Sequence, residues 1–153
     1  MDDEAPISLA DATCVLRRAL FAFVVGDVGA LELFTEDMIG DSPNLRVRSR
    51  TELEYQFIDR AGALSNVEFD LDGVVMDDPN SAVASWRVTG VHTGEVLFNE
   101  DIFLAPTGRQ IRLSMTTQAW FRLRRIAMFR TSYLDGDLFD QIRGRPLDPE
   151  EWW

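Results

Sequence analysis

The 153 residues are 46% apolar and 10% aromatic, a composition that excludes a disordered chain and is enough to bury a core. The net charge of −11, from 26 acidic and 15 basic residues, disfavours nucleic acid and anionic membranes, because phosphate binding depends on clustered Arg and Lys. The acidic start and the lack of a long apolar run predict a cytoplasmic protein. We expect one domain over 1–153, with 1–8 and 144–153 as tails.

The first predicted element is a helix that begins after Ser8. Ser8 and Asp11 resemble a capping box. Cys14 lies in the helical run, has no second cysteine to pair with, and is expected to be a small core residue. The apolar residues at helical spacing are Ala12, Val15, Leu16, Ala19, Leu20 and Phe23.

Two further helices are predicted before the first strand. Asp27 can cap a short second helix that ends near Asp37. The cluster Asp-Ser-Pro-Asn at 41–44 is typical of a turn. Ser49 repeats the capping pattern and predicts a third helix that stops near Gly62.

After residue 62 the apolar period changes to two, which indicates strands. Residues 110–123 are the clearest case, because the odd positions are nearly all apolar and the even ones mostly polar. Asp137 can cap a last short helix that reaches Ile142. The other predicted strands cover 67–71, 82–91, 96–105 and 126–133.

Helices first and hairpin-connected strands afterwards predict an α+β domain, with N-terminal helices packed on a strongly curved antiparallel sheet. Such a sheet wraps the helices into a cone, and its interior is where we expect a hydrophobic small molecule to bind.

The order of these elements and several short motifs resemble the NTF2-like superfamily. The motifs are Gly26-Asp27, Phe34-Thr35-Glu36-Asp37 before Asp41-Ser42-Pro43, the run from Trp86 to Gly94, Pro106-Thr107-Gly108-Arg109, and Tyr133-Leu134-Asp135. Over residues 9–143 the chain is most similar to SnoaL-like polyketide and ester cyclases, limonene epoxide hydrolase and ketosteroid isomerase. The resemblance implies a homodimer formed through the sheet and acid/base chemistry inside the cone, with no cofactor. We also expect no metal, because the single histidine, His92, has no partners at ligand spacing.

Carried over one residue at a time, the resemblance gives an incomplete site. Asp41, or Ser42, matches the general base of the isomerase, and at the lip of an apolar cone its pKa would be raised; an Asx-turn carboxylate is the alternative. The places of the isomerase's oxyanion donors hold Arg18 and Ala119. The arginine of the epoxide hydrolase corresponds to Arg87, but its two aspartates are replaced by Thr89 and Thr131, so we reject that assignment.

Strand alternation supplies the remaining candidates. Trp86 and Arg87 are adjacent, so only one of them can face the interior. His92, the only histidine, is either a general acid/base or a solvated loop residue, and Tyr133 offers a hydroxyl near the open end. The candidate catalytic residues are Asp41, His92 and Tyr133, and the candidate substrate-binding residues are Arg18, Tyr55, Trp86, Arg87, Thr117, Ala119, Phe129 and Thr131.

Two functions from different classes stay open. One is a cofactor-free cyclase, isomerase, dehydratase or hydrolase that acts on a hydrophobic, oxygenated small molecule. The other is a binding or dimerisation module that keeps the fold without the catalytic carboxylates.

Overall fold

The computed structural model describes residues 6–42, 45–94, 96–97, 103–104 and 106–133. Its helices are α1 (Leu9–Val25), the 3₁₀ helix η1 (Val28–Leu33) and α2 (Arg50–Arg60). All three predicted caps are present: the side chains of Ser8, Asp27 and Ser49 accept backbone N–H groups of the first turn. None of the described helices has the length and apolar character needed to cross a membrane.

The predicted second helix is too long, because its last residues already belong to a strand. Strand β1 runs from Phe34 to Ser42, so the helix ends before Phe34 and not near Asp37. Asp41 and Ser42, predicted in a turn, are the last two residues of this strand. Phe34 and Met38 are fully buried, and this burial holds the segment in the sheet.

The sheet has six strands in the order β2-β1-β8-β7-β4-β3. Neighbours are antiparallel as predicted, except β1 and β8, which are parallel, so the sheet is mixed but mostly antiparallel. The strands after β1 are β2 (Leu45–Val47), β3 (Leu64–Asp78), β4 (Ser81–His92), β5 (Val96–Leu97), β6 (Phe103–Leu104), β7 (Gln110–Arg122) and β8 (Arg125–Ser132).

The predicted single strand over 96–105 is wrong. The structure has two short strands there, β5 and β6, which pair antiparallel as a separate two-stranded sheet. The predicted helix at 137–142 lies outside the described residues.

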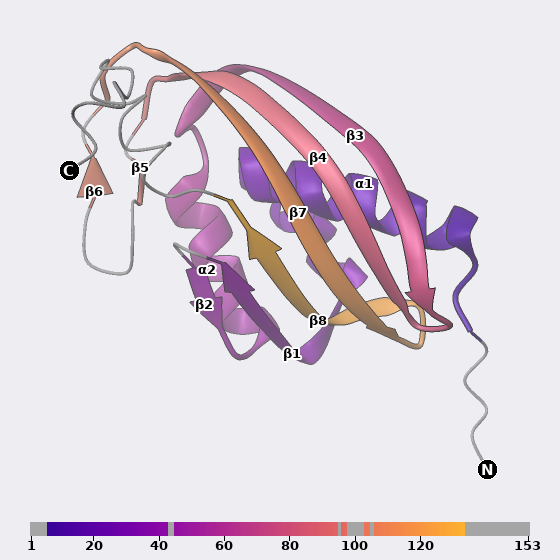
Figure 1. The fold of residues 1–153 in the computed structure, drawn as a ribbon. Helices are drawn as coiled ribbons and strands as arrows, with labels where there is room; N and C mark the ends of the chain where they lie inside the picture. Colours follow the sequence, from indigo (N-terminus) through magenta and orange to yellow (C-terminus); the bar gives the residue numbers. More distant parts are fainter. Residues whose placement is uncertain (1–5, 43–44, 95, 98–102, 105, 134–153) are drawn as a thin grey trace, which may run out of the picture.

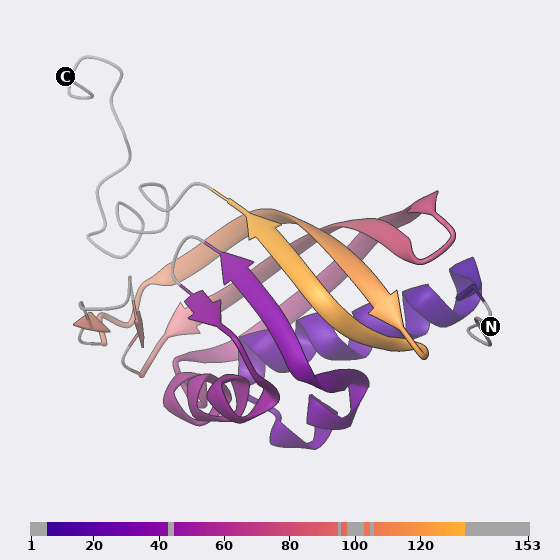
Figure 2. The same cartoon turned by 90° about the horizontal axis from the view of Figure 1, so that it is seen from below.

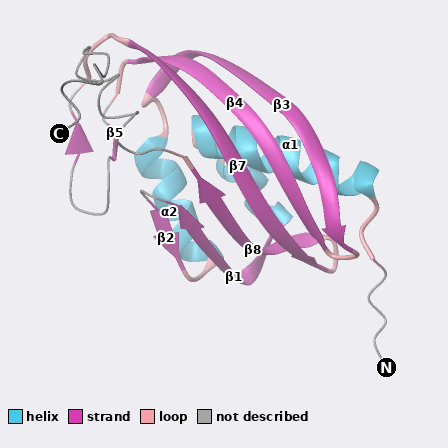
Figure 3. Cartoon of the chain, viewed as in Figure 1, coloured by secondary structure: helices cyan, strands magenta, loops and turns pink. Residues whose placement is uncertain are grey.

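The helices gather on one face of the six-stranded sheet, which we call the inner face (Figures 2 and 3). In Figure 1 the long strands β3, β4 and β7 arch over α1. The predicted α+β class with N-terminal helices on the sheet is therefore confirmed. On β7 the odd positions 111–121 turn inward as predicted, but Leu123 does not: it is 69% exposed, in the turn after the strand, at a φ of 53°.

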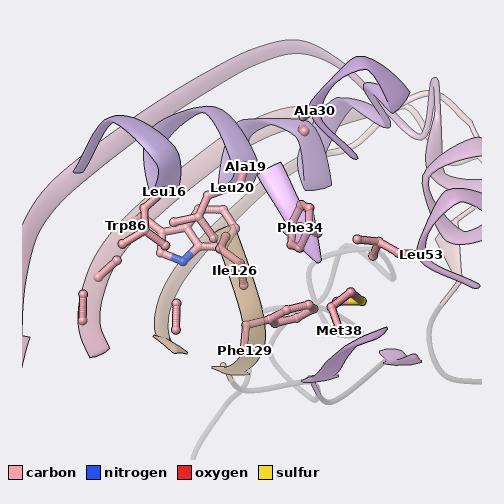
Figure 4. Close-up of a cluster of buried hydrophobic side chains, with 14 of the residues drawn as sticks. Leu16, Ala19, Leu20, Ala30, Phe34, Met38, Leu53, Trp86, Ile126 and Phe129 are labelled. Atoms are coloured by element: carbon pink, nitrogen blue, oxygen red, sulfur yellow. The ribbon is translucent and has the colours of Figure 1, made fainter. Parts of the chain in front are cut away.

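The core fills the space between α1 and the inner face. In Figure 4, Trp86 lies beside Leu16 and Leu20 of α1, and Phe129 points toward Met38. Cys14, predicted in the core, is exposed. Two residues along a helix turn the side chain by about 200°, which takes Cys14 away from the buried face that holds Leu16.

Candidate functional site

A chain of hydrogen bonds joins side chains of three adjacent strands on the inner face. Trp86 Nε1 on β4 donates to Thr117 Oγ1 on β7 at 3.0 Å. Thr117 Oγ1 lies 2.7 Å from Thr131 Oγ1 on β8. Thr117 is 1% exposed and Trp86 is 4% exposed, so this series of hydrogen bonds starts in the core and ends at Thr131.

Among the residues that the structure describes, the inner face is incompletely covered at the end where β8 stops. Leu113, Thr131 and Tyr133 occupy this region, yet all three are only partly buried. Leu113 and Tyr133 pack against Ile111, which is 1% exposed. We define the candidate site as Leu113, Thr131 and Tyr133, with Thr117 behind them. An apolar wall with two hydroxyls suits a mainly apolar ligand that carries an oxygen.

Ala119 and Phe129 form the floor beside this site. They are Cα partners across β7 and β8 and are 0% and 3% exposed. The Phe129 ring packs edge-to-face on Phe23, with ring centroids 5.0 Å apart. Both residues therefore face the interior as predicted, although they belong to the core.

His92 also faces inward, at the last position of β4, and is fully buried. The alternative of a solvated loop histidine is therefore wrong. Its Nδ1 lies 3.0 Å from Thr107 Oγ1, and its backbone N–H donates to the carbonyl of Arg109 at 2.8 Å. These contacts tie the end of β4 to the segment before β7.

The structure places Asp41 on the outer face, opposite to the predicted position inside the cone. Gly40 turns inward against Phe129, so its neighbour must turn outward. There Asp41 is a cross-strand partner of Arg46 and of Arg130, and its Oδ1 lies 3.5 Å from Arg46 Nε. The side chain is 43% exposed.

Arg87 is a second correction, since Trp86 takes the inner face and Arg87 the outer one. Its guanidinium donates two hydrogen bonds of 2.9 Å to the Asp72 carboxylate. These hydrogen bonds, and the charge of Arg87, hold the pKa of Asp72 below its usual range. Arg87 is thus engaged away from the candidate site.

Arg18 and Tyr55 do not reach the candidate site either. Arg18 donates to Glu32 Oε1 at 3.0 Å and to the carbonyl of Gly29 at 2.9 Å, which ties η1 to α1. Tyr55 on α2 is 65% exposed. Within the described ranges, no three His, Cys, Asp or Glu side chains are grouped so that they could hold a metal ion.

The contact that the sequence did not reveal is the indole hydrogen bond to Thr117. Trp86 and Thr117 were both candidates, but nothing in the sequence linked them. Alternation places each on the inner face, whereas their contact depends on the register of β4 against β7, in which Trp86 is the Cα partner of Met115.

Comparison of the sequence with models of protein families and with curated proteins gives no match. Solved structures do match. TsrD from Streptomyces laurentii superposes with a TM-score of 0.73 at 17% identity, over 89% of this chain and 97% of that one. A candidate SnoaL-like polyketide cyclase from Jannaschia sp. CCS1 gives 0.72 at 16% identity, over 95% and 100%.

An LEH-like epoxide hydrolase from M. tuberculosis is similar as well, with a TM-score of 0.65 at 11% identity, over 88% of this chain and 91% of that one. At such identities the likeness establishes the shared fold alone.

Proposed function

Given a chain with the NTF2-like fold, we propose that it binds a small, mainly apolar molecule that carries an oxygen, at the candidate site. The observation that supports this most is the position of Thr131. Its hydroxyl is linked to the buried Thr117 and lies where the inner face is incompletely covered. A ligand oxygen can hydrogen-bond there while its apolar part contacts Leu113.

The test compares two rigid bicyclic probes of one size, 1-indanone and indane, which differ in the carbonyl oxygen. Binding is followed by NMR titration, with the indole N–H of Trp86 as reporter. Thr131→Val keeps the shape and removes the hydroxyl, so 1-indanone should bind roughly 3- to 10-fold more weakly, the equivalent of one net hydrogen bond. Indane binding should not change.

The matched control is Thr116→Val, the same substitution at an exposed position on the outer face of β7. It should leave both affinities unchanged. If neither probe binds at millimolar concentration, or if both variants lose the same affinity, the proposal is wrong.

A second candidate is that the chain also converts its ligand, by acid/base chemistry without a cofactor. Two of the similar structures are named as a candidate polyketide cyclase and an epoxide hydrolase. Tyr133 follows Thr131 by two residues and packs against Ile111 together with Leu113. A second hydroxyl hydrogen bond to the ligand oxygen would stabilise negative charge on it. Asp41 has no part in this proposal, because it lies on the outer face.

Such polarisation would acidify the C–H bonds next to a carbonyl, so that solvent water takes the C2 proton as base and D₂O returns a deuteron to C2. The chain should then accelerate exchange of deuterium from D₂O into C2 of 1-indanone, measured by mass spectrometry, and Tyr133→Phe should slow that exchange. Exchange no faster than in buffer, with 1-indanone bound, would limit the function to binding.

The homodimer through the sheet remains a proposal. Ile39 and Met128 are Cα partners on the outer face and are 50% and 38% exposed, an apolar pair that a second copy could cover. In sedimentation experiments Ile39→Asp should weaken self-association. Val75→Asp, on an exposed position of the edge strand β3, should not.

A further inference from the structure

We propose that the candidate site selects ligands whose polar group only accepts hydrogen bonds, such as ketones, esters and epoxides. This selectivity rests on the proposed function, because it describes the same site. Trp86 sets it from a distance, by fixing the direction of the hydrogen bonds behind Thr131.

The indole of Trp86 determines which group donates in each of these hydrogen bonds. A tryptophan N–H can only donate, so Thr117 Oγ1 must accept from Trp86. The ring has little room to turn, since it is 4% exposed and packs against Phe69 with ring centroids 5.6 Å apart. One lone pair of the Thr117 oxygen is therefore permanently occupied.

Thr117 then has a single hydroxyl hydrogen to place. The residue is 1% exposed, and a buried hydroxyl hydrogen without an acceptor is destabilising. In the part of the chain that the structure describes, the acceptor within reach is Thr131 Oγ1, at 2.7 Å. Thr117 therefore donates to Thr131. The reverse direction would leave the Thr117 hydrogen buried with nothing to bond.

Thr131 accepts from Thr117, and no acceptor among the described residues takes its own hydrogen, which is left for the incompletely covered side. Accepting one hydrogen bond polarises its O–H group and strengthens it as a donor. A ligand oxygen that accepts will pair with this hydrogen. A ligand that can only donate will leave it unpaired, so such a ligand gains less from the site.

Three probes of similar size test the selectivity: 1-indanone only accepts, indole only donates, and indane does neither. We expect 1-indanone to bind roughly 3- to 10-fold more tightly than indane, and indole no more tightly than indane. Indole binding as tightly as 1-indanone would overturn the selectivity and leave the proposed function standing. If none of the three binds, the proposed function itself fails and the selectivity with it.

Two variants separate positioning from structural support. Thr117→Val frees the oxygen of Thr131 to accept from a ligand, so the ratio of 1-indanone affinity to indole affinity should fall by roughly 3- to 10-fold. Thr117→Ser keeps the hydroxyl and should restore the ratio. A purely structural role would weaken all three probes alike in Thr117→Val, and that result would overturn the proposal. If Thr117→Val does not fold, the probe series with the wild type and Thr117→Ser still decides.

Discussion

Gly40 lets the Phe129 ring lie directly against the backbone of β1. A Cβ at residue 40 would overlap Cε2 and Cζ of this ring and lie 2.9 Å from Cδ2. The ring is 3% exposed and cannot withdraw without disturbing Phe23 and Phe34, which it contacts edge-to-face. Overpacking of this kind costs about 1 to 3 kcal/mol, and each disturbed aromatic pair adds about 0.5 to 1.5 kcal/mol.

Gly40→Ala should therefore lower the free energy of unfolding by about 2 to 6 kcal/mol, which for this chain length lowers Tm by about 4 to 24 °C. Gly73→Ala is the matched control, because Gly73 is also in a strand and no atom lies within 4 Å of its added Cβ. There alanine should leave Tm unchanged or raise it slightly, since it restricts the unfolded chain. Equal Tm values for the two variants, in calorimetry and urea unfolding, would refute the packing argument.

Three further predictions concern stability. Thr117→Val should lower the free energy of unfolding in urea by about 1 to 3 kcal/mol, because an indole N–H loses its acceptor. Leu123→Asn with Arg124→Gly should raise it by about 1 to 2 kcal/mol, since both residues of this two-residue turn have positive φ. Arg87 lowers the pKa of Asp72 in the folded protein, so their ion pair stabilises the fold at pH values above the unfolded-state pKa of Asp72. This stabilisation is lost as the pH falls through the folded-state pKa. In Arg87→Met, an NMR titration should show a higher pKa of Asp72 than in the wild type.

The elements that the sequence predicted well are those with a clear period and a cap. Helix α1 begins where Ser8 caps it, and β7 shows the predicted inward odd face up to Phe121. The choice between Trp86 and Arg87 was also correctly reduced to one inward residue. These features are local, so one segment of sequence is enough to define them.

The errors concern features that depend on distant segments. Phe34 to Asp37 have no period of their own. The strand that contains them is fixed by the pairing of Phe34 and of residues 39–41 with β8, near the other end of the described chain. That pairing decides which way Asp41 faces, so the position of the expected base could not be found locally. The Trp86–Thr117 contact likewise depends on the register of β4 against β7, because the two residues are 31 positions apart in the sequence.

The parallel pairing of β1 with β8 affects synthesis as well as architecture. Residues 34–41 find their main sheet neighbour at 126–130, which leaves the ribosome last among the described strands. Until then, among the described strands, β1 has only the three residues of β2 beside it, and one edge of β1 is unpaired. A nascent chain stalled before residue 126 should thus be a substrate for chaperones, and completion of one C-terminal strand should release it.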